Sequence, residues 1–282
     1  MTSTMTGTVD PANAAQAQAW DGAEGEYWAA HAGAFERAVA GYDPPLFAAA
    51  AIRPGDHVLD VGCGTGATTR EAARRAEPGS ATGIDLSGAM IEVAQRAGGA
   101  NVRYVQGDAQ VHPFRTGEFD IVLSRTGAMF FGDPQAAFAN LARATRPGGR
   151  AVLLVWQGLA HNPWLAEITH ALAAGRDLPA PPEGAPGPFG LADPVRIRDL
   201  LGGAGYTRVE IADVREPLNF GPDPDTAHAF VAGLLRWMVA ELDPSTRARA
   251  LADLHAMLAA HHTSRGVELD SAAWLVTATT ES

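Results

Sequence analysis

Lysine is absent from this chain of 282 residues, so all 21 cationic side chains belong to arginine. Without lysine the protein cannot form a Schiff base with a carbonyl substrate or attach pyridoxal phosphate. It also lacks the lysine that completes a phosphate-binding loop. These classes of enzyme are therefore excluded.

Cysteine occurs once, as Cys63, which excludes an intramolecular disulfide and favours a reducing, cytoplasmic setting. Because Cys63 lies within a glycine-rich stretch, we expect a small packing residue rather than a nucleophile. No cationic residue precedes Arg37, and no apolar run reaches about 20 residues. The sequence therefore predicts neither a secretory signal nor a membrane span.

Acidic residues outnumber basic ones, and the resulting net charge of −11 argues against nucleic acid as the main partner. Hydrophobic residues make up 46% of the chain, enough for one substantial core. No repeat or long linker is visible. A single domain with a cap is expected, as a monomer or a homodimer.

The most informative segment is residues 58–66, with the sequence Val-Leu-Asp-Val-Gly-Cys-Gly-Thr-Gly. Its apolar residues favour a buried strand, and its glycines permit a tight turn with positive φ. Residues 67–76 are mostly good helix formers. Strand, loop and helix together form the first half of a nucleotide-binding βαβ unit.

The spacing of the glycines indicates which ligand the loop binds. A dinucleotide fingerprint requires G-x-G-x-x-G, whereas Gly62, Gly64 and Gly66 alternate here. Asp60, which precedes them, would disfavour a pyrophosphate but would accept a hydrogen bond from a cationic ammonium. A tight turn without a ligand is the alternative.

Two further carboxylates follow predicted strands. The strand over 81–85 ends in Asp85, where nucleotide folds bind a ribose diol. Ser87 caps the next helix, and Met90 on its first turn is suited either to an adenine face or to the core. Asp108 follows a strand over 102–106 and either reads an adenine amino group or forms an Asx turn.

The remaining pattern completes an α/β fold. Strands are expected over 119–123, 151–156, 209–211 and 274–277. Asp133-Pro134 is expected to begin a helix that ends near Thr145, and Asp193-Pro194 to begin another. These elements predict a seven-stranded, mostly parallel sheet with helices on both faces. Residues 1–19 are expected to be disordered, and 20–282 to form one domain with three cap segments: 20–45, 157–192 and 223–263. Segment 157–192 is expected to be mobile or irregular, and segment 223–263 to form two helices.

Five motifs in this order, VLDVGCGTG, GIDLS, GDAQ, FDIVLSRTGAMFF and RPGGR, resemble class I S-adenosylmethionine (SAM)-dependent methyltransferases. The chain is most similar to the ubiquinone/menaquinone C-methyltransferase-like group of bacterial small-molecule enzymes. The resemblance implies a Rossmann-like fold with a helical substrate cap, SAM as cofactor and S-adenosylhomocysteine (SAH) as product. The residues that it places on the cofactor are Asp60, Gly62, Cys63, Gly64 and Gly66 at the methionine end, Asp85 on the ribose, Leu86, Met90, Asp108 and Ala109 around the adenine, and Ser124 and Arg125 beside the sulfonium.

Methyl transfer requires alignment and exclusion of water, and it requires a base only for some acceptors. His31 and His161 lie in cap segments and are candidate bases, with ordinary polar histidines as the alternative. His261 and His262 point about 100° apart on a helix and have no evident third ligand, so no metal site is expected.

Arg125 either binds an acidic or carbonyl-bearing acceptor or pairs with a cap carboxylate. Apolar residues near it favour a hydrophobic acceptor. The candidate substrate-binding residues are Tyr27, Trp28, Arg125, Met129, Phe130 and Trp164.

The expected activity is therefore transfer of a methyl group from SAM to oxygen or carbon of a hydrophobic small molecule, such as a natural product, quinone or polyketide. Three alternatives stay open: a SAM-binding fold that catalyses a non-methylating rearrangement, N-methylation of a small amine, and a binding module without chemistry.

Overall fold

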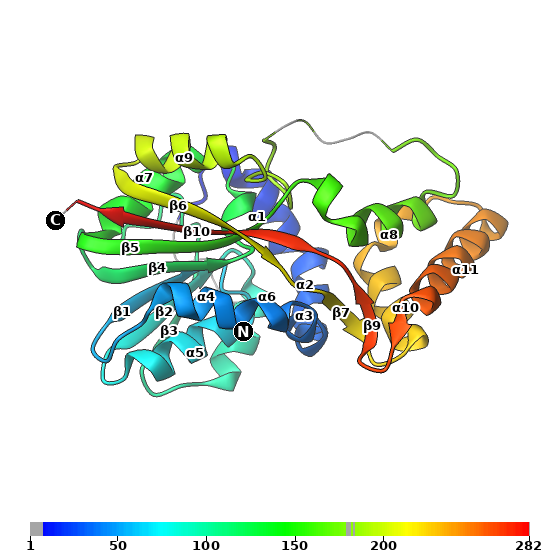
Figure 1. The fold of residues 1–282 in the computed structure, drawn as a ribbon, viewed down its shortest axis with the longest axis horizontal. Coiled ribbons are helices and arrows are strands. Elements are labelled where there is room, and N and C mark those ends of the chain that lie inside the picture. The colour runs from blue at the N-terminus through cyan, green and yellow to red at the C-terminus, as the bar shows by residue number, and fades with distance from the viewer. Residues whose placement is uncertain (1–7, 179–181, 183, 282) are drawn as a thin grey trace.

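The computed structural model describes residues 8–178, 182 and 184–281. A seven-stranded sheet forms its centre (Figure 1). The strand order is β3 (Val102–Gln106), β2 (Ser80–Asp85), β1 (His57–Val61), β4 (Phe119–Arg125), β5 (Thr145–Trp156), β10 (Ala272–Thr280) and β6 (Tyr206–Arg215). β10 is antiparallel to both neighbours, and the other pairings are parallel. The predicted mostly parallel sheet is confirmed.

Helices cover both faces of the sheet, as predicted. α5 (Ala67–Ala76) and α6 (Gly88–Ala97) carry the chain outward from β1 to β3, whereas α7 (Pro134–Ala144) carries it from β4 to β5 in the other direction. Because such crossovers are right-handed, the two sets lie on opposite faces. α4 (Asp43–Ala50) packs on β4 and β5, and α9 (Pro194–Gly203) packs on α7 and β6.

The central strands are buried on both sides. The apolar side chains of β1 and β4, and residues 151–156 of β5, are at most 6% exposed. Continuous apolar runs of this kind are typical of parallel strands that are covered by helices. The strand order reverses between β1 and β4, and ligands of open α/β sheets bind at the carboxyl ends of strands at such a point.

The N-terminal segment is more ordered than the sequence predicts. Residues 11–20 form η1 (Pro11–Asn13) and α1 (Ala14–Trp20), followed by α2 (Ala23–Ala30), α3 (Ala32–Val39) and η2 (Ala40–Tyr42). The expected disorder of residues 1–19 is therefore wrong for residues 11–19, because tertiary hydrogen bonds hold a segment of weak local preference. Residues 1–7 lie outside the described part of the chain.

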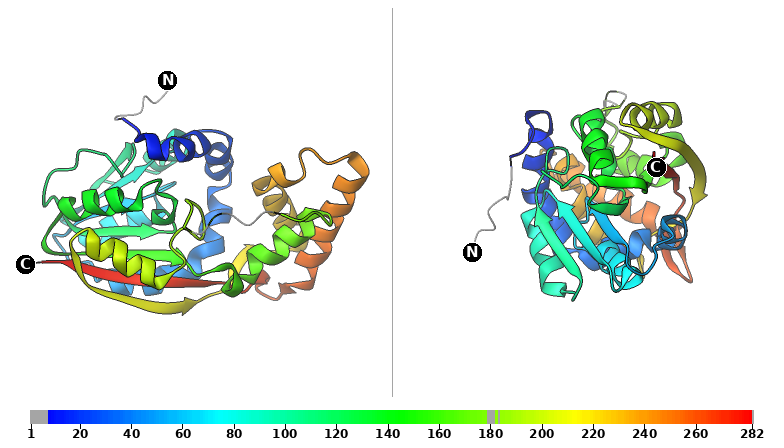
Figure 2. Two further views of the ribbon diagram at one scale, coloured as in Figure 1. Left: turned by 90° about the horizontal axis from the view of Figure 1, so that it is seen from above. Right: turned by 90° about the vertical axis from the view of Figure 1, so that its left-hand side faces the viewer.

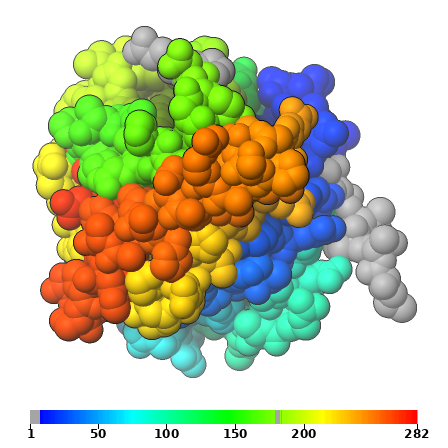
Figure 3. Space-filling model, turned by 90° about the vertical axis from the view of Figure 1, so that its right-hand side faces the viewer, coloured from blue at the N-terminus to red at the C-terminus, as the bar shows by residue number. Residues whose placement is uncertain are grey.

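The other cap segments form a second lobe at the end of the molecule opposite the C-terminus (Figure 2). The lobe contains η4 (Leu159–His161), α8 (Pro163–Ala173), α10 (Pro224–Leu234), η5 (Arg236–Met238) and α11 (Pro244–Ala260). Figure 3 shows α11 crossing this face in orange, between α8 in green and the blue N-terminal helices. The two helices expected within 223–263 are present, and part of 157–192 is helical rather than irregular.

A small antiparallel sheet in this lobe was not predicted. Its order is β7 (Leu218–Gly221), β9 (Gly266–Leu269) and β8 (His262–Thr263), and α3 packs against β7. Among the described residues, no helix combines the length and the apolar character that crossing a membrane requires.

Four of the described α-helices begin with proline directly after an aspartate at the N-cap. Asp133, Asp193, Asp223 and Asp243 each accept a hydrogen bond from a backbone N–H of the first helical turn. The following proline has no N–H that needs a partner. The sequence predicts the first two of these helix starts, and both are confirmed.

Replacing the cap of α7 tests this local rule. Asp133→Ala removes the acceptor for the Ala136 N–H, which lies 3.0 Å away. We expect the free energy of unfolding to fall by about 1 kcal/mol, measured by urea denaturation. Asp133→Asn keeps a capping oxygen and is the control. An equal loss in both variants would contradict the capping role.

Candidate functional site

The glycine-rich loop turns sharply between β1 and α5. Gly62, Gly64 and Gly66 have φ angles of 67°, 54° and 80°, in the left-handed region that favours glycine. A Cβ at Gly62 would lie 2.8 Å from the Cα of Gly127, in the loop after β4. Gly127 was not singled out in the sequence, because its role depends on a contact between two distant loops.

Asp60 lies beneath this loop and is fully buried. Its Oδ2 accepts hydrogen bonds from the hydroxyls of Thr68, at 2.6 Å, and Thr69, at 2.7 Å. Its Oδ1 has no hydrogen-bond partner among the described residues. Burial raises the pKa of Asp60, while the two hydroxyls oppose that rise. A buried carboxylate oxygen is therefore available to a hydrogen-bond donor from outside the chain.

Asp85 connects the end of β2 to the same loop. Its Oδ2 accepts from the Gly64 N–H at 2.8 Å, and its Oδ1 accepts from the Ser87 N–H at 2.9 Å. Burial raises the pKa of Asp85 to about 6. The sulfur of Met90 lies 3.6 Å from where a Cβ of Gly64 would be, so the predicted adenine residue does adjoin the loop.

Cys63 is a buried packing residue, as expected. Its side chain is 5% exposed, and burial raises the pKa of its thiol well above the ordinary value. A thiol that stays protonated is a poor nucleophile. Leu86 is half-buried, and its carbonyl accepts a hydrogen bond from Gln106 Nε2 at 3.2 Å.

Asp108 forms the Asx turn that was one of its two interpretations. Its Oδ1 accepts from the Gln110 N–H at 2.9 Å. The same oxygen accepts from Asn13 Nδ2 at 3.0 Å, and Oδ2 accepts from the Asp10 N–H at 3.1 Å. The N-terminal segment thus lies directly on Asp108, beside the buried Ala109.

A second contact holds the N-terminal segment over the strand ends. Asp21 Oδ1 accepts from the Gly88 N–H at 2.8 Å, at the start of α6. It also accepts from Gln106 Nε2, at the end of β3, at 2.9 Å. The first cap segment is therefore fixed to the carboxyl ends of β2 and β3. Neither Asn13 nor Asp21 was predicted.

Ser124 supports the loop from behind. Its hydroxyl donates to the Val61 carbonyl at 2.7 Å and accepts from the Ala128 N–H at 3.0 Å. Both interactions join the end of β1 to the turn after β4. The Ser124 side chain is fully buried, so its observed role is to hold the two loops together.

Arg125 pairs with two carboxylates of the first cap segment. Its Nη2 donates to Glu36 at 2.5 Å and its Nη1 donates to Asp43 at 2.7 Å. The structure therefore favours the ion-pair interpretation over capture of an acidic acceptor. Thr126, with φ of 59°, follows as a rare non-glycine residue in the left-handed region.

Aromatic side chains of the first cap segment contact one another and Phe130 of η3 (Ala128–Phe130). The Trp20 ring makes edge contacts with Trp28 and Phe130, with centroids 5.6 and 5.1 Å apart. The Tyr27 ring stacks on His31 at 4.0 Å, and its hydroxyl donates to the Phe230 carbonyl at 2.7 Å. Phe35 stacks on Trp28 with ring centroids 3.4 Å apart, and we call the rings of Trp20, Tyr27, Trp28, Phe35 and Phe130 the aromatic group. Three predicted substrate-binding residues belong to it, and the candidate base His31 stacks on it.

The remaining predicted acceptor residues and the two candidate bases make other contacts. Trp164 contacts Trp156 and Phe220, with centroids 6.0 and 6.2 Å away. Met129 is 4% exposed, and its carbonyl accepts from the Gly187 N–H. His161 is exposed on η4. His31 Nδ1 lies 2.8 Å from the Tyr27 carbonyl oxygen.

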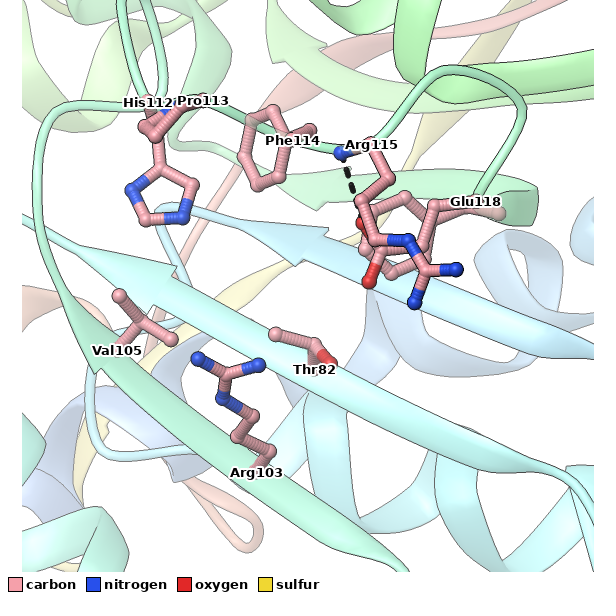
Figure 4. Close-up of a pocket in the computed structure, with 9 residues that line it drawn as sticks. Thr82, Arg103, Val105, His112, Pro113, Phe114, Arg115 and Glu118 are labelled. Atoms are coloured by element: carbon pink, nitrogen blue, oxygen red, sulfur yellow. Dashed lines mark hydrogen bonds between the residues drawn. The ribbon is translucent and has the colours of Figure 1, made fainter.

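Two surface cavities lie away from the loop. One of about 150 Å³ lies by β2 and β3, where Figure 4 shows Arg103 and Arg115 near Thr82. The other, of about 780 Å³, lies between α8 and α11. Within the described ranges, no group of three or more histidine, cysteine, aspartate or glutamate side chains is arranged to hold a metal ion.

Similarity to known proteins identifies the family of this chain. Residues 58–149 match the family model described as "Methyltransferase domain". A nocamycin O-methyltransferase of Saccharothrix syringae is 35% identical over 237 residues, which is 74% of this chain and 80% of that protein. The chain belongs to the class I SAM-dependent methyltransferases.

Other similar proteins match over part of the chain or at low identity. An uncharacterized protein of Mycobacterium tuberculosis is 40% identical over 124 residues, and the match spans 43% of this chain and only 44% of that protein. The solved phosphoethanolamine N-methyltransferase 2 of Haemonchus contortus has a TM-score of 0.57 and 17% identity, over 98% of this chain and 61% of that one. The latter likeness supports the methyltransferase fold alone.

The contact between the two loops of this methyltransferase can be tested at Gly127. A Cβ there would lie 2.8 Å from the Val61 carbonyl oxygen and 2.9 Å from the Gly62 Cα, both backbone atoms. We expect Gly127→Ala to lower the free energy of unfolding by about 1–3 kcal/mol in urea denaturation. Gly158→Ala, where no atom lies within 4 Å, is the control. Equal stability of the two variants would show that the loops need not touch.

The pKa of Asp85 predicts a pH dependence of stability. That pKa is about 6 in the folded chain and ~3.9 in an unfolded one. Between about pH 3.9 and 6, therefore, the Asp85 carboxyl holds a proton in the folded protein that it releases in the unfolded one. The resulting stabilisation is present below about pH 4 and is lost as the pH rises through 6. Relative to Asp85→Asn, the wild type should lose roughly 2 kcal/mol of unfolding free energy between pH 4 and 7. A constant difference between the two proteins over this range, measured in urea, would refute the raised pKa.

Proposed function

We propose that the chain transfers a methyl group from SAM to a hydrophobic small molecule. The observation that carries this proposal is the buried, unpartnered Oδ1 of Asp60 beneath the alternating-glycine loop. The methionyl ammonium of SAM is a donor of the required charge. Asp85, at the end of β2, is in the position that binds a ribose diol in nucleotide folds.

The roles of the surrounding residues follow from the same geometry. We assign Gly62, Cys63, Gly64 and Gly66 to the methionine end, because this loop allows close approach of backbone to ligand. Met90 adjoins the loop and would pack on the adenine, with Leu86, Asp108 and Ala109 around it. We assign Ser124 and Arg125, at the end of β4 next to β1, to positions beside the sulfonium.

The protein contributes alignment and exclusion of water rather than covalent chemistry. When bound, SAM supplies an activated methyl group on its sulfonium. The aromatic group formed by Trp20, Tyr27, Trp28, Phe35 and Phe130 offers an apolar surface to the acceptor. His31, on the same cap segment, is the better placed of the two candidate bases because His161 is exposed.

The acceptor is proposed to be a natural product, quinone or polyketide that is methylated on oxygen or carbon. The aromatic cap favours a planar hydrophobic molecule, and the neutralisation of Arg125 by Glu36 and Asp43 disfavours an anionic one. The Saccharothrix relative is named an O-methyltransferase, which supports oxygen as the methylated atom. We also propose that the chain belongs to the ubiquinone/menaquinone C-methyltransferase-like group. We propose further that residues 20–282 form a single domain and that the three cap segments recognise the acceptor.

Titration calorimetry with SAM, SAH and NAD tests the cofactor. We expect micromolar binding of the first two ligands and none of NAD, and binding of NAD alone would overturn the proposal. Incubation with SAM carrying a labelled methyl group and a panel of hydroxylated aromatic acceptors then tests transfer. Turnover of an acceptor that leaves SAM intact would instead indicate a rearrangement.

Asp60→Asn tests the residue that carries the proposal. The variant keeps the shape of the side chain but removes the charged acceptor, so SAM affinity should fall at least tenfold, or roughly 1.5 kcal/mol. Asp120→Asn is the control, because it neutralises a buried carboxylate at the opposite end of β4. Unchanged calorimetric affinity of Asp60→Asn, or an equal loss in both variants, would remove Asp60 from the site.

A further inference from the structure

The small cavity beside β2 and β3 lies on the face of the sheet opposite α5. Gly83 of β2 faces α5, since a Cβ there would lie 2.8 Å from both Cys63 Sγ and Thr69 Oγ1. Side chains alternate along a strand, so Thr82 points to the other face, as does its partner on β3, Arg103. None of the residues that line the cavity is assigned above to SAM or to the acceptor.

The buried part of the cavity wall is apolar. Val105 of β3, Phe114 of the connection between β3 and β4, and Phe119 of β4 are 7%, 6% and 4% exposed. The cavity has a volume of about 150 Å³. An apolar cavity of ~150 Å³ is large enough to bind benzene. The inner part of this cavity therefore suits one small aromatic ring.

The exposed part of the wall is cationic. Arg103 on β3 and Arg115 in the connection are exposed, and Figure 4 shows both guanidinium groups near Thr82. Neither guanidinium has a hydrogen-bond or ion-pair partner among the described residues. Two free guanidinium groups beside one hydroxyl offer several donors to a carboxylate.

Two further polar side chains in the lining do not cancel this charge. The Glu118 carboxylate accepts a hydrogen bond from the Arg115 backbone N–H at 3.0 Å, drawn as a dashed line in Figure 4. Burial, and then the charge of Arg103, lower the pKa of His112, although Glu118 opposes them. His112 is therefore largely uncharged near neutral pH. Two arginines and one glutamate give the lining a net charge of +1.

We propose that this cavity is a second binding site, which takes a small aromatic carboxylate. The ring would lie against Val105, Phe114 and Phe119, and the carboxylate would accept hydrogen bonds from Arg103 and Arg115. The planar guanidinium group matches the geometry of a carboxylate. The inference does not depend on SAM, because the cavity shares no residue with the proposed cofactor site.

Protein-detected NMR with benzoate as the probe tests the site. We expect a dissociation constant on the order of 1 mM, as is usual for so small a ligand, and shifts of the signals of β3 and of residues 112–119. Benzyl alcohol keeps the ring without the charge, and acetate keeps the charge without the ring. Each should bind at least about fivefold more weakly than benzoate.

Replacing the arginines tests their role in binding the carboxylate. Arg103→Gln and Arg115→Gln should each weaken benzoate about fivefold, the upper end for an exposed ion pair, and leave benzyl alcohol unchanged. Arg198→Gln is the matched control, because Arg198 is also exposed but lies on α9, outside the cavity. Circular dichroism verifies that each variant is folded.

The outcomes separate this inference from the proposed function. Equal affinity for benzoate and benzyl alcohol, or an equal loss in Arg198→Gln, would overturn the inference. So would shifts confined to the aromatic group, which would place benzoate at the proposed acceptor site instead. Absence of benzoate binding also overturns the inference but leaves the proposed function untouched, since titration of the same protein with SAM tests that function separately.

Discussion

The backbones of Gly62 and Gly127 touch where the two central strands end. This contact determines how close the glycine-rich loop after β1 comes to the turn after β4. Ser124 reinforces it with one hydrogen bond to each side, and Thr126 adopts a left-handed conformation that costs of order 1–3 kcal/mol. The positions of Asp60 and Arg125 relative to each other depend on this junction.

Polar contacts add to aromatic packing in placing residues 13–43 over the site. Asp21 and Asn13 bind the ends of β2 and β3, and Glu36 and Asp43 bind the end of β4. Hydrogen bonds between charged groups are directional and stronger than neutral ones. This part of the chain is rich in alanine and has little intrinsic preference for one docking orientation. The polar contacts therefore fix its position.

Local patterns in the sequence predicted most of the fold. The apolar strands, the alternating glycines and the Asp-Pro helix starts each involve residues close together in the chain, and the structure has all of them. The partners of Arg125 lie 82 and 89 positions away, and the sequence left two interpretations open there. Gly127, Asn13 and the short strands of the small sheet were missed because their significance arises only from tertiary contacts.

The position of β10 imposes an order on folding. In the described part of the chain, β6 pairs in the sheet with β10 alone, and β10 comes much later in the sequence. During synthesis β6 therefore has no strand partner until residues 272–280 have left the ribosome. An unpaired strand edge invites association with other chains. A stalled or truncated chain that lacks β10 would expose both β5 and β6, so the nascent protein depends on its last strand for protection against aggregation.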